Sequence, residues 1–305
     1  MDDLVAILGP TASGKSQLAL ALAEQLNGEI VSCDSAQVFT GLDIGTAKPT
    51  PEDQARVPHH LLDRVEPSLQ WTAATFQKEA DRSIREIRSR GRIPFLCGGT
   101  GLWYRALIHG IFAAPAISSQ VREHVRDRLE REGSQALHRV LASMDPDAAV
   151  RISPNDPQRI GRAIEYFIQT GEQISVRQRA HRFREQRYGV RAYALSWPRN
   201  ALWQRIHIRT RRMYAAGLVN ETQALLRAGL PSDAPGLRII GYRDAVQVVR
   251  GRLTEEEAVE ATSIATRQFA KRQRNWFNHE PTVRWIDATL DVAKVRRMVL
   301  DPKAL

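Results

Sequence analysis

The chain has 305 residues, and its 44 Lys and Arg against 34 Asp and Glu leave a formal net charge of +10. A chain of this length can bury a core without disulfides or a structural metal. Cys33 and Cys97 are its only cysteines, with neither CxxC spacing nor a Cys/His set for zinc, which excludes disulfide-stapled and zinc-bound classes and favours a reducing compartment. The positive charge favours a polyanionic partner, although a solvated basic surface gives the same excess.

Neither a membrane span nor a targeting signal is visible in the sequence. No stretch approaches the ~20 consecutive apolar residues that a transmembrane helix needs. The acidic start "MDDLVAILGP" has a short apolar run and lacks the basic region of a signal peptide. We therefore expect a cytoplasmic protein without a membrane partner.

The first elements are predicted to be a strand, a loop and a helix. The apolar run "LVAILG" ends in glycine, and the apolar residues of "KSQLALALAEQLNG" recur at helical spacing up to Gly28. A second strand, "EIVSCDS", has Asp34 and Ser35 as its last residues. After a Pro-rich, charged stretch through Pro67, "TAATFQKEADRSIREIRSRG" predicts a helix ending at Gly91, and "IPFLCGGTG" predicts a strand that runs into glycines.

This alternation predicts an α/β fold with a P-loop-type parallel sheet flanked by helices. In such sheets the chemistry lies outside the carboxyl ends of the strands. Residues 9–16, Asp34 and Thr100 all fall at such ends, which makes them the first candidates for a site.

The middle of the chain has a different character. From about Ser118 the sequence predicts Arg-rich helices with no convincing strand between them, and a strand pattern returns at "VRAYALSW". We therefore predict three segments: the first part of a P-loop catalytic core in 1–115, an inserted all-helical domain in 116–187, and a return to the core with basic C-terminal helices in 188–305.

The stretch "GPTASGKS" carries a phosphate-binding motif. It fits G-x-x-x-x-G-K-[ST] and lies between a predicted strand and a predicted helix, as the motif requires. The glycines allow a turn that aims backbone N–H groups inward, the helix N-terminus adds a positive dipole end, and the lysine adds a charge. The predicted phosphate-binding residues are Gly9, Pro10, Thr11, Ala12, Ser13, Gly14, Lys15 and Ser16. The hydroxyl of Ser16 is the expected ligand of a Mg²⁺ cofactor.

A P-loop does not by itself show that a nucleotide is hydrolysed. An NTPase usually has a long apolar strand ending in an acid that holds Mg²⁺, and only "EIVSCD", ending at Asp34, comes close. Asp34 is therefore a magnesium ligand, a general base or an ordinary strand-end residue. Arg205 and Arg209 lie four apart on one predicted helix face, where they either reach the phosphates or form a solvated face.

Five further blocks lie in order across nearly the whole chain: "DSAQVFTGLDIGTAKPTPEDQARVPHHLLD", "GGTGLWYRALIHG", "NDPQRIGRAIE", "IIGYRD" and "ATRQFAKRQRNWF". Together with the P-loop they closely resemble the bacterial tRNA dimethylallyltransferases of the IPP transferase family. A P-loop alone is shared by many unrelated enzymes, whereas this combination is highly specific.

The resemblance implies a reaction. A dimethylallyl group passes from dimethylallyl diphosphate to N6 of adenosine 37, next to the anticodon in tRNAs that read codons beginning with U, and diphosphate is released. The exocyclic amine is a poor nucleophile because its lone pair is delocalised, so a proton acceptor helps. Asp34 is our candidate for that acceptor, and Lys15 would stabilise the leaving diphosphate. Thr100 of "GGTG" is expected across from Asp34, unless it only caps the following helix.

The resemblance also assigns residues to the tRNA anticodon stem-loop. Near the reacting adenosine these are Asp34, Ser35, Ala36, Gln37 and Thr100. In the insertion they are Gln158, Arg159, Ile160, Gly161 and Arg162. In the last third of the chain they are Arg238, Ile239, Ile240, Gly241, Tyr242, Arg243, Lys271, Arg272, Gln273, Arg274, Asn275, Trp276, Phe277 and Asn278.

The residues themselves also favour an RNA role for the last of these groups. A capping box at Thr254 and Glu257 predicts the start of a long helix, and basic side chains crowd about two turns of it without an acid. Basic groups hold RNA backbone and aromatic faces can stack unpaired bases. Trp276 and Phe277 either do this or pack into the core.

Three other functions fit parts of the sequence. An adenylate isopentenyltransferase shares the loop and the donor but has no need of the insertion or the basic helix. A P-loop small-molecule kinase would also use this loop and sheet. A non-enzymatic RNA-binding protein explains the charge but leaves Asp34 and Thr100 without a role. We expect the chain to act as a monomer.

Overall fold

The structure is a computed structural model that describes residues 3–111, 115–181 and 186–301. The chain divides into two compact units, one made of Met1–Ile108 with Gln186–Leu305 and the other of His109–Glu185. The bounds predicted for the inserted domain were 116–187. None of the helices in the described ranges is long and apolar enough to cross a membrane.

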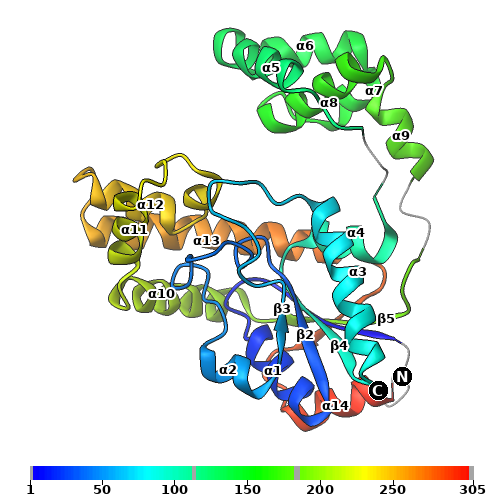
Figure 1. Ribbon diagram of the computed structural model, residues 1–305, viewed down its shortest axis with the longest axis vertical. Helices are drawn as coiled ribbons and strands as arrows, with labels where there is room; N and C mark the ends of the chain where they lie inside the picture. Colours follow the sequence, from blue (N-terminus) through cyan, green and yellow to red (C-terminus); the bar gives the residue numbers. More distant parts are fainter. Residues whose placement is uncertain (1–2, 112–114, 182–185, 302–305) are drawn as a thin grey trace. The chain divides into compact units, whose positions relative to one another are not determined.

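A parallel sheet forms the centre of the first unit (Figure 1). In the described residues it has six strands in the order β3-β2-β4-β1-β5-β6, and each neighbouring pair is parallel. The strands are β1 Leu4–Leu8, β2 Gly28–Cys33, β3 His59–His60, β4 Ile93–Gly98, β5 Val190–Ser196 and β6 Val283–Asp287. β5 and β6 follow the insertion in sequence and extend the sheet beyond β1, so the chain re-enters the sheet as predicted.

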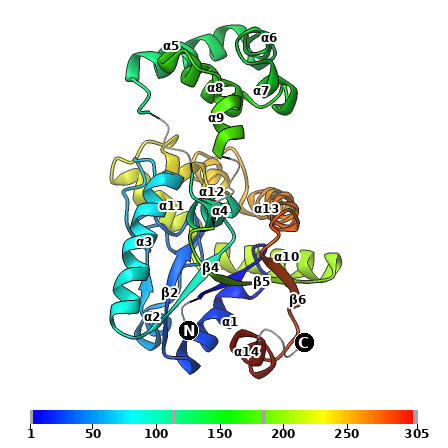
Figure 2. The ribbon, with the colours of Figure 1, turned by 90° about the vertical axis from the view of Figure 1, so that its right-hand side faces the viewer.

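Helices cover both faces of this sheet. They are α1 Lys15–Gln25, α2 Pro51–Arg56, α3 Ala73–Ser89, α4 Gly101–His109, α10 Arg199–Ala215, α11 Leu218–Arg227, the 3-10 turn η1 Pro235–Arg238, α12 Tyr242–Val249, α13 Glu255–Asn278 and α14 Val292–Leu300. Strand β1 shows the arrangement, because its side chains alternate between the two faces. Val5 and Ile7 pack with α1 and α14, while Leu4, Ala6 and Leu8 join the core under α3, α4 and α13 (Figure 2). The predicted α/β fold class is confirmed.

The second unit is built of helices in its described residues, which are α5 Ser119–Glu132, α6 Ser134–Met144, α7 Pro146–Arg151, α8 Pro157–Thr170 and α9 Ile174–His181. It has its own apolar core, which includes Val125, Leu137 and Ile164. The buried carboxylate of Asp145 accepts hydrogen bonds from Ala148 N and Ser175 N, which joins the starts of α7 and α9.

The structure corrects several predicted boundaries. Helix α1 ends at Gln25, not at Gly28, and Gly28 is the first residue of β2. Glycine is needed there because a Cβ would lie 2.5 Å from the ring of Phe95 in β4, the neighbouring strand of the sheet. Strand β2 ends at Cys33, so Asp34 lies in the turn after it. The capping box that starts α13 at Thr254 is present in full.

Candidate active site

The phosphate-binding motif forms a loop between β1 and α1, as its sequence predicts. Gly9 and Gly14 have φ angles of 135° and 94°, a backbone region that favours glycine. A Cβ on Gly9 would also lie 3.1 Å from Leu195 N of β5, so the loop packs closely against the sheet. The Lys15 ammonium group donates a hydrogen bond to Pro10 O at 3.4 Å, and the side chain is 8 % exposed.

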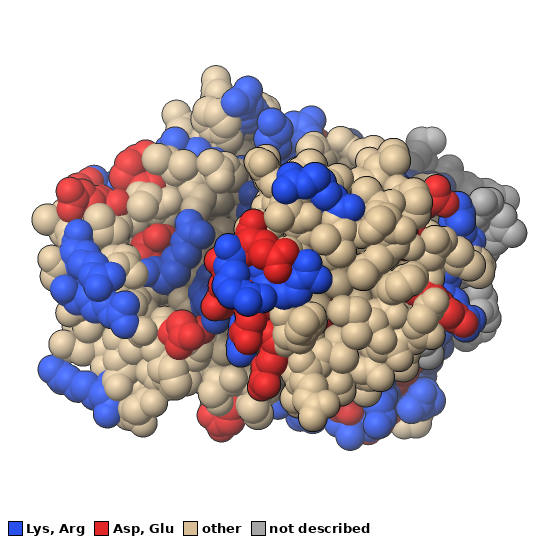
Figure 3. Space-filling view, turned by 90° about the horizontal axis from the view of Figure 1, so that it is seen from above, with Lys and Arg blue, Asp and Glu red and all other residues tan. Residues whose placement is uncertain are grey.

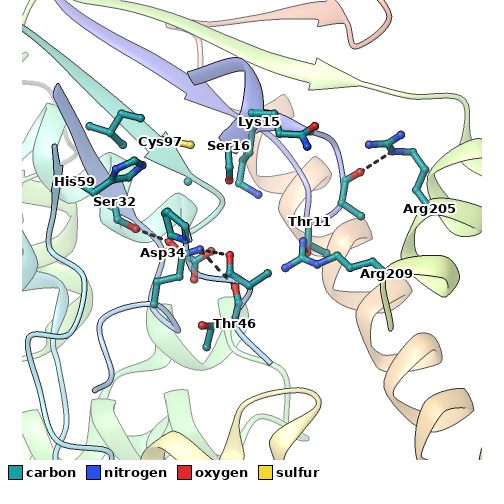
Figure 4. A pocket seen from close by; sticks show the side chains of 18 of the residues that line it. Thr11, Lys15, Ser16, Ser32, Asp34, Thr46, His59, Cys97, Arg205 and Arg209 are labelled. Atoms are coloured by element: carbon teal, nitrogen blue, oxygen red, sulfur yellow. Dashed lines mark hydrogen bonds between the residues drawn. The ribbon is translucent and has the colours of Figure 1, made fainter. Parts of the chain in front are cut away.

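Side chains that follow β5 in the sequence hydrogen-bond to the phosphate-binding loop and hold it in place. Arg205 Nε donates to Ala12 O at 2.9 Å, and Arg209 Nη1 donates to Thr11 Oγ1 at 3.0 Å (Figure 4). Both arginines come from α10 and face the loop, so the alternative of a solvated arginine face is wrong for them. Trp197 gives a third support that was not predicted from the sequence, because its Nε1 donates to Ser13 O at 2.9 Å.

The loop, the end of β2 and helix α10 enclose one cavity of 510 Å³ (Figure 4). The predicted site residues in its wall are Thr11, Ala12, Gly14, Lys15, Ser16, Asp34, Gln37, Arg205 and Arg209. The cavity therefore brings the phosphate-binding loop, the Ser16 hydroxyl, the Asp34 carboxylate and two arginines into one wall.

Other wall residues were not found by sequence reasoning. They are Gln17, Ile30, Ser32, Thr46, Ala47, Pro49, His59, Cys97, Gly98, Ile208 and Arg212. Many of them come from strand interiors or from the Pro-rich stretch before Pro67, which shows no helical or strand period. Thr46, Ala47, Pro49 and His59 do lie within the sequence block that begins at Asp34, and this is the signal that could have found them.

Asp34 lies in the turn after β2 and contributes to the cavity wall. Its Oδ1 accepts a hydrogen bond from Ala36 N at 2.9 Å, which fixes the turn that follows. Gln37 is held on the same turn, because Ser32 Oγ donates to its Oε1 at 2.9 Å and its Nε2 donates to Ala47 O at 3.2 Å. The carboxylate is thus presented at the end of the strand.

Thr100 is not in the cavity wall but contacts the Asp34 turn directly. Its Oγ1 accepts a hydrogen bond from Ser35 N at 3.0 Å, and its backbone N donates to Cys33 O at 3.2 Å. The preceding Gly98 is necessary for this approach, because a Cβ there would lie 2.0 Å from Cys33 O. Thr100 and Asp34 are therefore brought together across the ends of β2 and β4.

Burial sets the electrostatics of the cavity. Loss of hydration lowers the pKa of Lys15 from its ordinary value of 10.5, and the nearby Asp34 carboxylate acts in the opposite direction. Burial also lowers the pKa of Arg209, again opposed by Asp34. Cys97 behaves as a neutral thiol, because burial raises its pKa to about 11. Lys15 and Arg209 are therefore poorly hydrated cations in the cavity wall. An anionic ligand beside them would compensate for the lost hydration, so the cavity favours an anion.

The donor groups of the cavity fit a magnesium ion that is shared with a phosphate ligand. The exposed Ser16 hydroxyl and the Asp34 carboxylate belong to the same wall. Among the described residues there is no cluster of three or more His, Cys, Asp or Glu side chains that would hold a metal alone. Mg²⁺ is commonly bound through one or two protein oxygens together with substrate phosphates and water, which matches this set.

The residues predicted to bind tRNA on α13 fall into two classes. Lys271, Arg272, Arg274, Asn275 and Asn278 are exposed. Gln273 and Phe277 are buried, with 6 % and 1 % of their surface exposed, and Trp276 packs against the core. Phe277 meets Tyr104 edge to face at 6.2 Å, and the Arg105 guanidinium lies 4.7 Å from the Trp276 ring. We therefore correct the prediction for the side chains of Gln273 and Phe277, which have a structural role, whereas Trp276 is half-buried and its contact with tRNA stays a prediction.

The block around η1 and α12 needs the same correction. Arg238 and Arg243 are exposed, whereas Gly241 and Tyr242 are buried and Ile239 and Ile240 are half-buried. Tyr242 is fully buried, and its hydroxyl contacts Gly45 N at 3.1 Å and the Glu221 carboxylate. Arg238 and Arg243 are the two exposed side chains of this block, and their contact with tRNA stays a prediction.

In the second unit the predicted block opens helix α8. Gln158 and Arg159 are exposed and Arg162 is half-buried, while Ile160 and Gly161 are buried. A Cβ on Gly161 would lie 3.1 Å from Leu129 Cδ1, so the glycine allows α5 and α8 to pack closely. The two buried residues therefore serve the core of the unit, which corrects their assignment to tRNA.

The basic side chains seen in Figure 3 do not form a single patch. Lys and Arg lie at several separate places in this view, with Asp and Glu between some of them. Total charge alone therefore does not locate an RNA surface, and the position of each basic residue relative to the cavity has to be considered.

Comparison with known proteins identifies the family. Residues 37–280 match the model of a family described as IPP transferase. The chain belongs to the IPP transferase family. It is 45 % identical over 284 residues to the tRNA dimethylallyltransferase of Geobacter sulfurreducens, covering 93 % of this chain and 91 % of the relative. It is 47 % identical over 278 residues to that of Myxococcus xanthus, covering 91 % and 90 %.

Solved structures agree with this family. The tRNA isopentenylpyrophosphate transferase of Bacillus halodurans matches with a TM-score of 0.72 and 37 % identity, over 98 % of this chain and 96 % of that one. A eukaryotic dimethylallyltransferase, described as acting on tRNA, matches with a TM-score of 0.81 and 26 % identity, over 99 % of this chain and 79 % of that one. The match extends over both units of the chain.

Proposed function

We propose that this IPP transferase acts as a tRNA dimethylallyltransferase. It transfers the dimethylallyl group of dimethylallyl diphosphate to N6 of adenosine 37, in tRNAs that read codons beginning with U. The observation that carries the proposal is that one cavity joins a phosphate-binding loop to the Asp34 carboxylate, with Thr100 bonded to the same turn. The curated relatives named tRNA dimethylallyltransferase support the reaction.

In the proposed reaction the bond between the allylic carbon and the diphosphate oxygen breaks and a bond to N6 forms. The amine proton passes to Asp34, and diphosphate leaves with the electron pair of the broken bond. Loop N–H groups, Lys15 and Arg209 would stabilise the charge that develops on the leaving oxygens. A Mg²⁺ ion held by Ser16 and diphosphate oxygens would supply further positive charge there. Water needs no activation, because the diphosphate departs intact.

The proposed partner is the anticodon stem-loop of tRNA, and the chain is proposed to work as a cytoplasmic monomer. Adenosine 37 has to leave its stack to reach a cavity at the strand ends, which costs a few kcal/mol unless protein contacts replace the stacking. Light scattering of the purified protein tests the monomer, and a stable dimer would overturn it.

The deciding experiment omits nucleotides. Purified protein given tRNA, Mg²⁺ and dimethylallyl diphosphate is expected to complete many turnovers and to release one diphosphate per modified adenosine. Free adenylate offered instead of tRNA should give little product, which separates this function from an adenylate isopentenyltransferase. Product formation only when ATP is added and consumed would contradict the proposal and favour kinase-type chemistry.

A further inference from the structure

Helix α13 places one buried amide among exposed cations. Lys271, Arg272 and Arg274 are exposed, whereas Gln273 between them is 6 % exposed and points inward. Burying an amide is costly unless its donor and acceptor are both hydrogen-bonded. The partners of Gln273 therefore show what this side chain does.

The two halves of the Gln273 amide bind two different loops. Thr11 N of the phosphate-binding loop donates to Gln273 Oε1 at 2.8 Å. Gln273 Nε2 donates to Gly99 O, in the turn after β4, at 3.0 Å. The orientation of the amide is unambiguous, because a backbone N–H can only donate and a carbonyl can only accept. One side chain thus spans the two loops.

The helix also fits closely against the turn after β4. A Cβ on Gly99 would lie 2.1 Å from Gln273 Nε2, and a Cβ on Gly101 would lie 2.1 Å from Trp276 Cδ1. Thr100 lies between these two glycines and bonds to Ser35 N beside Asp34. A shift of the turn against α13 would therefore move Thr100 relative to the Asp34 turn.

We propose that Gln273 is a positioning residue for the prenyl transfer. Its amide sets the separation between the loop that holds the leaving diphosphate and the turn that places Thr100 beside Asp34. The inference rests on the proposed function, because it assigns the loop to the donor and the Asp34 turn to the acceptor. Misplacement of reacting groups by about 1 Å can cost ~10²-fold in rate.

The test is a comparison of two neighbouring variants. Gln273→Met keeps a similar length but removes both hydrogen bonds, and we expect kcat to fall by about tenfold or more with an unchanged KM for tRNA. Arg272→Gln, on the exposed face of the same turn, should show the opposite pattern, with a raised KM for tRNA and little change in kcat. Steady-state kinetics on an anticodon stem-loop measure both.

Three results would overturn the proposal. A raised KM with normal kcat in Gln273→Met would make Gln273 an RNA contact, and wild-type values of both would leave the link without a role. The third concerns Gln273→Glu assayed at a pH high enough to ionise the new carboxyl, where it keeps an acceptor for Thr11 N but cannot donate to Gly99 O. We expect a reduced kcat in this variant while circular dichroism shows it folded at the assay temperature, and normal kcat there would exclude the Gly99 bond. If the wild-type protein forms no product on tRNA, the proposed function fails instead.

Discussion

At the residue scale, Asp34 makes the sharpest chemical prediction. Asp34→Asn keeps the shape and the Oδ1 acceptor that binds Ala36 N but removes the proton acceptor. We expect turnover to fall by about 10²-fold or more while donor binding survives. Single-turnover assays measure the first quantity and calorimetry the second.

A matched control exists at the end of another strand of the sheet, away from β2. Asp287 ends β6, and its Oδ1 accepts from Thr289 N at 2.8 Å in the same i to i+2 arrangement, but it is not part of the cavity wall. Asp287→Asn should leave turnover unchanged. Near-normal turnover of Asp34→Asn would remove Asp34 from the role of general base.

Cys97 provides a pH-dependent prediction in the same cavity. Its thiol pKa is raised to about 11 by burial, so the unreactive thiol form persists until the pH approaches that value. On the order of one thiol in a thousand ionises near pH 8, and only the thiolate reacts with iodoacetamide. We expect slow labelling of Cys97 at neutral pH that accelerates about tenfold per pH unit, measured by peptide mass spectrometry. Fast labelling of the folded protein at neutral pH would contradict this, and denatured protein is the control.

At the scale of elements, α13 has an exposed basic face and an inward face that carries Gln273. Its exposed cations Lys271, Arg272 and Arg274 are predicted to hold RNA phosphates. Neutralising any one to Gln should weaken binding of all tRNA substrates and lower the salt slope by about one unit or less. Lys294→Gln on α14 is the control and should change neither quantity. A loss confined to tRNAs of one sequence would indicate base readout instead.

The loop before α2 shows how helices α11 and α12 shape the cavity. Glu221 of α11 accepts hydrogen bonds from Asp43 N and Ile44 N at 3.2 and 3.1 Å, and the Tyr242 hydroxyl of α12 contacts Gly45 N. The loop then leads directly into the cavity wall at Thr46 and Ala47.

Tyr242→Phe tests the corrected role of this tyrosine. Loss of a buried hydrogen bond to a carboxylate should destabilise the fold by roughly 1.5–3 kcal/mol. Direct affinity for tRNA should not change, since Tyr242 is fully buried. Thermal unfolding and filter binding measure the two effects. A variant of normal stability with weakened tRNA binding would restore the prediction made from the sequence.

At the scale of the whole molecule, features that depend on neighbouring residues were predictable from the sequence and features that depend on distant ones were not. The phosphate-binding loop and the α13 capping box are written in a few consecutive residues. The inward orientation of Gln273 depends on Thr11 and Gly99, which are far away in the chain. Likewise, the aromatic residues of α13 fit either a core or an RNA surface until the packing partner Tyr104 is known.

Weak local signals explain the elements that were missed. Strand β3 has two residues, too few for any period, and α2 lies in a Pro-rich stretch where its first-turn Pro51 reads as a loop signal. β6, "VRWID", has Trp285 and Ile286 side by side, so it shows no strict period of two, and its five residues are too few for a clear strand signal. Such short strands at the ends of the sheet form by pairing with a neighbouring strand, and that neighbour cannot be recognised from their own few residues.

The two units have separate cores, and each carries an exposed arginine predicted to bind tRNA, Arg159 on α8 and Arg272 on α13. Because no core residue is shared, the free-energy costs of Arg159→Gln and Arg272→Gln should add within about 0.5 kcal/mol in the double variant. The salt slope should fall by roughly the sum of the two single changes, each about one unit or less. Arg131→Gln, an exposed change in the second unit, is the control and should leave binding unchanged. The affinity for tRNA is measured at several salt concentrations for these four variants and for the wild-type protein. The double variant could instead bind tRNA with the same affinity as the single variant that has the lower affinity. In that case one contact depends on the other, and the two units do not hold the tRNA independently.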